Sequence, residues 1–252
     1  MASVTVKNLT LRFPVYGADN RSLKKQLAMI SVGGKIGKGV GRAPIVTALS
    51  NVNMRLRPGD RLALIGHNGS GKTTFLRALS GAYEPDEGSI EVSGRVTALL
   101  DLGLGIDPSA TGYDNIRLRG LIAGLSMKEI EAKTEDIARF TDLGGFLSMP
   151  LKTYSAGMQA RLAFAVATSV DADVLLLDEW IAVGDAKFRA AAHERLLDLV
   201  ERARILVLAS HDVQLVRYYC NKVVRFDSGV ASKVHPIEDL DALLAMPSGE
   251  TA

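Results

Sequence analysis

Nine consecutive residues combine the residue types that are needed to bind a phosphate group. Gly66, followed by Gly71, Lys72 and Thr73, has the spacing of the phosphate-binding loop pattern. Glycines let successive backbone N–H groups face one anion, and the helix expected after the loop adds the positive end of its dipole. Lys72 can reach the β- and γ-phosphates, and the Thr73 hydroxyl can bind Mg²⁺. An ordinary glycine-rich turn is the alternative, and a strand before the loop and a helix after it favour phosphate binding. The loop comprises Gly66, His67, Asn68, Gly69, Ser70, Gly71, Lys72, Thr73 and Thr74.

Two further apolar runs end in side chains that suit phosphate chemistry. Asp178 and Glu179 follow the run 174–177, and His211 follows the run 205–210. In open parallel sheets, ligands bind beyond the carboxyl ends of the strands, so these groups are expected near the phosphate loop. Asp178 is then a candidate Mg²⁺ ligand, and Glu179 can accept a proton from an attacking water. His211 is a candidate sensor of the γ-phosphate. The alternatives are a solvated turn for the carboxylates and a buried structural histidine.

The elements that must position these groups are also visible in the sequence. Residues 4–6 and 9–13 alternate apolar and polar side chains, which predicts a pair of half-buried antiparallel strands. The apolar run 61–65 predicts the strand before the loop, and residues 111–147 have a largely helical pattern. The glycines and basic residues at 33–42 predict a loop. The fold class predicted is α/β, a mostly parallel sheet flanked by helices.

Length and composition restrict the functional classes. With 252 residues and 47% hydrophobic content, the chain suits one sizeable α/β domain with a smaller subdomain. Thirty basic and 28 acidic residues give a net charge of +2, which provides no footprint for nucleic acid. The single cysteine, Cys220, excludes an intramolecular disulfide and is expected to be a small core residue. Neither a signal peptide nor an apolar run of ~20 residues is evident, which predicts a cytoplasmic protein.

The stretch 153–162 carries a resemblance to a known family. It is similar to the Leu-Ser-Gly-Gly-Gln signature of the ATP-binding cassette (ABC) ATPases, with Tyr154, Ala156 and Met158 as substitutions. The resemblance spans about residues 4–230 and implies the RecA-like phosphate-loop NTPase fold with an N-terminal antiparallel β subdomain and an inserted α-helical subdomain. It also implies ATP hydrolysis with ATP and Mg²⁺ as cofactors. The signature residues implied to contact nucleotide are Ser155, Ala156, Gly157 and Met158.

Within this family the chain resembles the ATPases of polysaccharide exporters, which serve O-antigen, capsule and teichoic-acid polymers. The similarity lies in residues 99–103, in the signature, and in 178–185, where Asp185 would be the D-loop aspartate. The insertion 17–45 resembles the gate helix and loop of O-antigen exporter ATPases, and a solvated surface hairpin is its alternative.

One feature of the sequence departs from the family pattern, and one residue assignment has two candidates. The glutamine expected after Leu100 is absent, and Asp101 is the nearest polar candidate for contact with Mg²⁺. The aromatic residue that stacks on adenine is Phe13 or Tyr16.

The resemblance also implies partners and a division of the chain. It implies a homodimer at the cytoplasmic face of the bacterial inner membrane, bound to polytopic (Wzm-like) permease subunits that carry a lipid-linked polysaccharide. The alternatives are another ABC transporter ATPase such as an importer subunit, a soluble phosphate-loop kinase, and an ABC protein acting on ribosomes or DNA. The expected parts are an ATPase domain 1–235, with core 1–105 and 156–235, insertion 17–45 and helical subdomain 106–155, and a short tail 236–252 without a carbohydrate-binding domain.

Overall fold

The computed structural model of the chain divides into two compact units. The first comprises Met1–Gly94, Leu176–Glu179 and Arg204–Ala252, and the second comprises Arg95–Leu175 and Trp180–Ala203. The structure describes residues 2–15, 35–38, 44–100, 103, 105–179 and 186–247.

An antiparallel sheet forms the N-terminal part of the first unit. Its order is β2-β3-β1-β5, where β1 is Ser3–Pro14, β2 Lys35–Lys38, β3 Pro44–Leu56 and β5 Glu87–Ser93. Residues 35–38 belong to the loop expected from the glycines at 33–42, but their backbone pairs with the start of β3. The predicted helix within the insertion 17–45 falls outside the described residues.

The pair of strands expected at 4–6 and 9–13 is one continuous strand, so that expectation is wrong. β1 pairs with β3 on one side and with β5 on the other, and its register with β3 shifts between Val6 and Leu9. Asn8 adopts a left-handed backbone with φ of 48°, and its N–H donates to Asn53 Oδ1. Such a bulge interrupts the alternation of side chains without ending the strand.

The parallel strands of the first unit position the phosphate loop. β4 (Arg61–Ile65) lies between β8 (Ile205–Ala209) and β9 (Lys222–Asp227) and is parallel to both. β7 (Val174–Asp178) follows β8 in the sheet, and the short strands β10 (Val230–Ala231) and β11 (His235–Pro236) pair antiparallel with β9. The buried apolar side chains of β4, β7 and β8 explain their continuous hydrophobic runs, because central parallel strands are covered on both faces.

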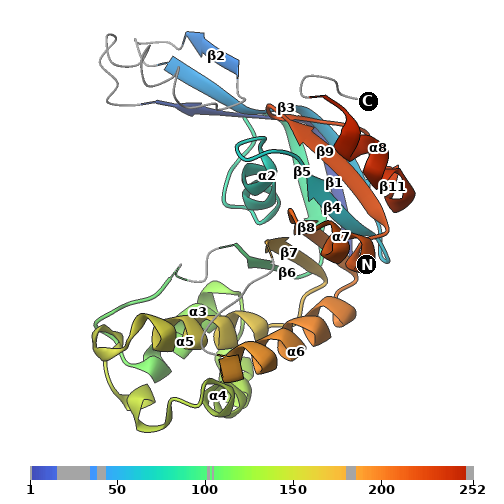
Figure 1. The fold of residues 1–252 in the computed structure, drawn as a ribbon. Helices are drawn as coiled ribbons and strands as arrows, with labels where there is room; N and C mark the ends of the chain where they lie inside the picture. Colours follow the sequence, from blue (N-terminus) through green and yellow to red (C-terminus); the bar gives the residue numbers. More distant parts are fainter. Residues whose placement is uncertain are drawn as a thin grey trace. The chain divides into compact units, whose positions relative to one another are not determined.

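Helices cover both faces of these parallel strands (Figure 1). α2 (Lys72–Leu79) contacts β3, β5 and β8, and its Phe75 ring packs 5.2 Å from the ring of Phe226 in β9. α7 (Val213–Tyr219) and α8 (Leu240–Ala245), the latter preceded by the 3₁₀ turn η3 (Ile237–Asp239), lie on the opposite face. The first unit therefore holds α2 between its two sheets.

The second unit is mainly helical. Strand β6 (Val96–Leu99) leads into α3 (Gly112–Ile122), α4 (Met127–Thr141), the 3₁₀ turns η1 (Gly144–Ser148) and η2 (Leu151–Thr153), α5 (Ala156–Thr168) and α6 (Ala186–Arg202). Ile116, Ile130 and Leu162 belong to one buried cluster that joins α3, α4 and α5. A capping box begins α4, since the side chains of Ser126 and Glu129 each accept a hydrogen bond from the other residue's backbone N–H group. α6 packs on α5 in this unit, where the rings of Phe188 and Phe164 have centroids 6.2 Å apart.

Candidate nucleotide-binding site

The phosphate loop connects β4 to α2 through positions that only glycine can occupy. Gly66 has φ of 140°, and a Cβ there would lie 2.2 Å from the carbonyl oxygen of Phe226. Gly71, the residue before α2, has φ of 111°, and its Cβ would meet the Ala48 carbonyl at 3.1 Å. Gly229 holds the loop from β9, since its N–H donates to the carbonyl of Ser70 over 2.9 Å. The glycine-rich sequence thus reflects close backbone packing around the loop.

Lys72 lies at the centre of the loop. Its Nζ donates to the carbonyl of Gly66 at 2.6 Å and to that of His67 at 3.0 Å. Burial lowers the pKa of Lys72 below its ordinary value, while the carboxylates of Asp178 and Glu179 act in the opposite direction. The ammonium is therefore held inside the loop by two carbonyls that a phosphate oxygen can replace.

A cavity of about 450 Å³ opens beside this loop, entirely within the first unit. This volume is in the range of sites that enclose a small molecule. The cavity gathers the phosphate loop, the end of β7 and the residue after β8. Its lining residues are Val46, Ala48, Asn68, Gly69, Gly71, Lys72, Thr73, Thr74, Asp178, Glu179, His211 and Gly229.

Glu179 has an unusual backbone for its residue type. Its φ is 68°, and its N–H donates to the carbonyl of Ala209 at 2.8 Å, which binds it to the end of β8. The Ser210 hydroxyl donates to Glu179 Oε2 at 3.3 Å, and His211 Nε2 lies 3.7 Å from Oε1. Glu179 and His211 are each about half exposed, with side-chain exposures of 50% and 54%. A carboxylate and an imidazole thus meet at the cavity, as general acid–base chemistry on a bound phosphate requires.

The expected metal ligands fit a magnesium ion that is bound with a nucleotide. Thr73 and Asp178 both line the cavity and supply oxygen atoms, which Mg²⁺ prefers. Among the described residues, no group of three or more His, Cys, Asp or Glu side chains could hold a metal ion. A Mg²⁺ ion held by Thr73 and Asp178 would complete its coordination with phosphate and water oxygens, as Mg²⁺ commonly does in nucleotide sites. Asp101, the third expected ligand, lies outside the described residues.

Phe13 and Tyr16 are the two candidates for stacking on adenine. The Phe13 ring packs edge-on against Tyr83, with ring centroids 5.0 Å apart, and Phe13 does not line the cavity. Tyr16 and Asp185 lie outside the described residues. The assignment of either aromatic residue to adenine stays a prediction.

The signature residues belong to the second unit, at the start of α5. Ser155 is the N-cap, and its Oγ accepts from the N–H of Met158 at 3.2 Å. Ser155, Ala156 and Gly157 are exposed, and Met158 is half-buried against the helical core. Ser155, Gly157 and Met158 line a cavity of about 540 Å³. The exposed N-terminus of α5 presents a hydroxyl and backbone N–H groups, which suit an anion.

Sequence reasoning missed four residues at the phosphate cavity. Val46 and Ala48 come from β3, Gly229 from the turn after β9, and Ser210 holds the carboxylate of Glu179. The turn at 228–229 was visible as Ser228-Gly229 after a strand, but nothing in the sequence placed it against the phosphate loop.

The fold and this site define a phosphate-loop nucleotide-binding protein. Residues 49–182 match the sequence model of the ABC transporter family. The chain is 43% identical over 230 residues to the O-antigen export system ATP-binding protein RfbE of Yersinia enterocolitica, covering 91% of this chain and 96% of that one. It belongs to the ABC transporter family, and it is an ATPase of that family.

Other comparisons agree with this family. The teichoic acids export ATP-binding protein TagH of Lactiplantibacillus plantarum is 34% identical, and the match covers 87% of this chain and 58% of TagH. A dimeric ATP-binding cassette in a post-hydrolysis state bound to ADP and Pi has the same fold, with a TM-score of 0.65 and 20% identity over 93% of this chain and 98% of that one. An ATP-binding subunit of an ABC transporter has a TM-score of 0.66 at 21% identity, covering 98% and 95% of the two chains. The expected fold class and family are thus confirmed.

Proposed function

We propose that this chain is the ATP-hydrolysing motor subunit of an exporter that moves a lipid-linked cell-surface polysaccharide across the bacterial inner membrane. The observation that carries this proposal is the 43% identity to an O-antigen export ATP-binding protein over 96% of that protein's length. Relatives named for teichoic acid export support the same class of cargo, an anionic or lipid-linked polymer of the cell envelope. The specific cargo that we propose is an O-antigen-like polymer.

The residues of the first unit have distinct roles in the proposed hydrolysis. Lys72 exchanges the carbonyls of Gly66 and His67 for oxygens of the β- and γ-phosphates. Thr73 and Asp178 are the residues that would hold a Mg²⁺ ion, which would neutralise charge on the phosphates. Glu179 orients the attacking water and accepts its proton, and His211 contacts the γ-phosphate.

The second unit completes the site in a homodimer. Ser155 and Gly157 of one protomer contact the γ-phosphate of the ATP bound by its partner, so two nucleotides are enclosed symmetrically. Two hydrogen bonds to each of the two nucleotides make four per dimer. At ~1.5–3 kcal/mol each, the four together exceed the ~5.5 kcal/mol that moves an equilibrium from open to closed. ATP binding then closes the dimer, and hydrolysis releases it.

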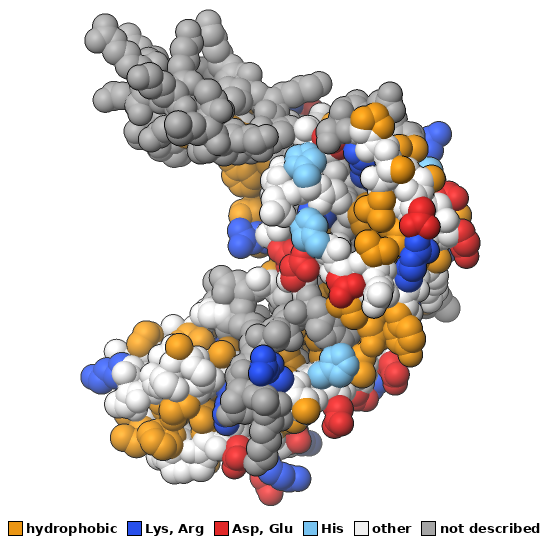
Figure 2. Space-filling model, viewed as in Figure 1, with side chains coloured by type: hydrophobic (Ala, Val, Ile, Leu, Met, Phe, Trp, Pro, Cys, Tyr) orange, Lys and Arg blue, Asp and Glu red, His pale blue; other side chains and the backbone are white. Residues whose placement is uncertain are grey.

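The permease and membrane contacts are also proposals. Among the described residues, no helix has the length and apolar character needed to cross a membrane. The proposed path of the polymer lies in the permease subunits. Figure 2 shows hydrophobic side chains on the surface of the second unit. Leu118, Leu121 and Ile122 of α3 have 39%, 50% and 60% of their surface exposed. These residues are available to contact a polytopic permease at the cytoplasmic face of the inner membrane. The insertion 17–45 is proposed to act as a gate at the membrane surface.

The cellular test is to delete the gene and follow the envelope polysaccharide. Loss of the polymer from the cell surface, together with lipid-linked polymer accumulating inside, is expected. The native chain should restore export, and Glu179→Gln at equal expression should not. Normal surface polymer in the deletion strain would contradict the proposed cargo.

Assays on the purified protein distinguish an exporter ATPase from a kinase. Purification from membranes should bring down a polytopic permease, and ATP should be converted to ADP and free phosphate. Transfer of the γ-phosphate to a small molecule, with no release of free phosphate, would support the kinase alternative.

A further inference from the structure

A buried carboxylate lies behind the phosphate loop, at the end of β9. The Asp227 side chain is 5% exposed, and its Oδ1 accepts from the Ser228 hydroxyl at 2.8 Å. Arg225 Nη2 lies 3.7 Å from Oδ2, and His67 Nε2 lies 3.4 Å from Oδ1. Because a buried carboxylate is costly unless paired, its position is specified by these partners. One of them, His67, is the second residue of the phosphate loop.

His67 connects that carboxylate to the loop backbone. Its Nδ1 lies 2.8 Å from the carbonyl of Asn68, while its Nε2 faces Asp227. The ring therefore lies between two oxygen acceptors and donates to one of them in either neutral tautomer, which restricts the direction of the backbone at residues 67–68. The carbonyl of His67 meanwhile accepts from Lys72 on the nucleotide side of the loop. The ring and the carbonyl of one residue thus link Asp227 to the lysine that receives the phosphates.

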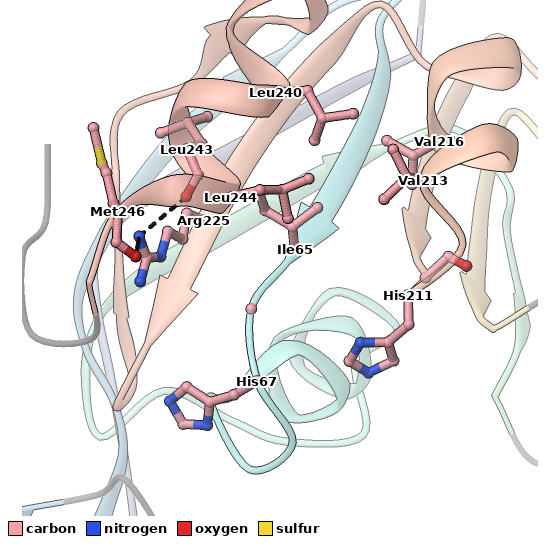
Figure 3. Close-up of a pocket in the computed structure, with 12 residues that line it drawn as sticks. Ile65, His67, His211, Val213, Val216, Arg225, Leu240, Leu243, Leu244 and Met246 are labelled. Carbon is pink, nitrogen blue, oxygen red and sulfur yellow. Dashed lines mark hydrogen bonds between the residues drawn. The ribbon is translucent and has the colours of Figure 1, made fainter.

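Arg225 extends the connection to the C-terminal helix. Its Nη1 donates to the carbonyls of Leu243 and Met246 at 3.0 and 2.7 Å, and its Nη2 donates to that of Pro247 at 3.0 Å. These carbonyls are at the end of α8, where a cation is favourable. Figure 3 shows His67 at the edge of a cavity of about 320 Å³, with Arg225 and its bond to Leu243 on the same side.

The end of β9 and the turn after it hold the loop at three points. The Phe226 carbonyl lies against Gly66, Asp227 faces the His67 ring, and the Gly229 N–H donates to the Ser70 carbonyl. The first and third contacts use backbone atoms alone. The contact between Asp227 and His67 is the one that depends on side chains, and so it can be changed by substitution.

We propose that Asp227 is a positioning residue for nucleotide binding, which acts through His67 to hold the phosphate loop in the shape that receives phosphates. Asp227 does not contact nucleotide. The inference needs only that the phosphate loop binds nucleotide, and it is independent of the exported cargo. Loss of the contact between Asp227 and His67 should weaken the binding of Mg-ADP and of Mg-ATP to a similar degree, since the same loop binds the phosphates of both.

The test is a double-mutant cycle on the full chain, with the Kd for Mg-ADP and the unfolding temperature both measured. Asp227→Asn and His67→Ala should each raise the Kd by about tenfold, and the double variant should be no weaker than the weaker single variant. His67→Gln, which keeps a side-chain donor, should recover most of the affinity. Asp239→Asn is the matched control, because it removes the carboxylate of the His235–Asp239 pair (3.3 Å) elsewhere in the first unit. That control should bind Mg-ADP as the native chain does.

Three results would overturn the inference. The first is an Asp227→Asn protein that unfolds at a lower temperature but keeps the native Kd. The second is full additivity of the two single effects in the double variant. The third is equal affinity of His67→Gln and His67→Ala, which remains readable even where Asp227→Asn fails to fold.

Discussion

Glu179 combines an exposed carboxylate with a backbone conformation that a residue with a Cβ rarely adopts. A φ of 68° costs of order 1 kcal/mol and persists here because Glu179 N–H is bonded to β8 and its carboxylate to Ser210. Strain of this kind is found where a side chain must be aimed at a reacting group. These contacts with β8 and Ser210 direct the Glu179 side chain toward the cavity.

Glu179→Gln should bind Mg-ATP with near-native affinity and hydrolyse it at least ~100-fold more slowly, because the amide cannot accept a proton from water. Steady-state phosphate release, measured beside the Kd for Mg-ATP, checks both halves of this expectation. Phosphate release within a few-fold of the native rate would remove Glu179 from the role of general base.

Cys220 shows how burial changes the chemistry of one residue. The thiol is buried at the C-cap of α7, and desolvation raises its pKa to about 12, with Arg61 acting in the opposite direction. The thiolate is the reactive form, so a thiol reagent at pH 8 should leave the folded chain unmodified and label it after denaturation. Mass spectrometry before and after adding guanidinium makes this measurement. Rapid labelling of the native chain would show that α7 opens or that the site is not buried.

At the scale of elements, the phosphate loop depends on how closely β9 approaches β4. The pairing of β4 with β9 places the Phe226 carbonyl oxygen 2.2 Å from the position that a Cβ on Gly66 would take. Only glycine therefore fits at position 66. The glycine pattern of this loop is therefore a packing requirement as well as a means of exposing N–H groups to phosphate.

Gly66→Ala tests this packing. The added methyl meets a backbone carbonyl that cannot move away without disturbing β9, so nucleotide binding should fall at least ~100-fold with a stability loss of several kcal/mol. Gly81→Ala is the control, since Gly81 also has a positive φ but has no atom within 4 Å of an added Cβ. It should lose only ~1 kcal/mol and keep its affinity for nucleotide. Equal effects of the two substitutions would show that backbone strain alone, without the clash, accounts for the requirement for glycine at position 66.

Two serines that cap neighbouring helices allow a structural effect to be distinguished from a functional effect in the second unit. Ser155 caps α5 and Ser126 caps α4, and each Oγ accepts from a backbone N–H three residues on, at 3.2 and 3.3 Å. Replacement of either by alanine should cost ~0.5–2 kcal/mol of stability. Only Ser155→Ala should also lower ATP hydrolysis, by more than tenfold, because its hydroxyl is proposed to contact the partner's γ-phosphate. Thermal unfolding and ATPase rates of the two variants decide this, and equal ATPase rates would count against the signature assignment.

At the scale of the whole molecule, sequence reasoning was strongest where a local pattern has one physical cause. The run 61–65, the loop 66–74 and the carboxylates after 174–177 could be placed because apolar strands and glycine turns have short-range signatures. The bulge at Asn8 was missed because it breaks the alternation without ending the strand. The contacts of Asp227 with His67 and of Gly229 with Ser70 span about 160 residues, and no local pattern encodes such a distance. The partition of the chain and the roles of individual site residues stay predictions.

The central claim at this scale is that two copies of the chain enclose two nucleotides, each supplying Ser155 to the other's site. The claim requires that the γ-phosphate, and not nucleotide in general, drives association. The hydrolysis-blocked Glu179→Gln chain allows ATP to be compared with ADP under equilibrium conditions.

The most direct measurement is the mass of the isolated Glu179→Gln chain in solution, by sedimentation or light scattering. We expect saturating Mg-ATP to double that mass, while Mg-ADP leaves the chain monomeric. A chain that stays monomeric with saturating Mg-ATP would contradict the account.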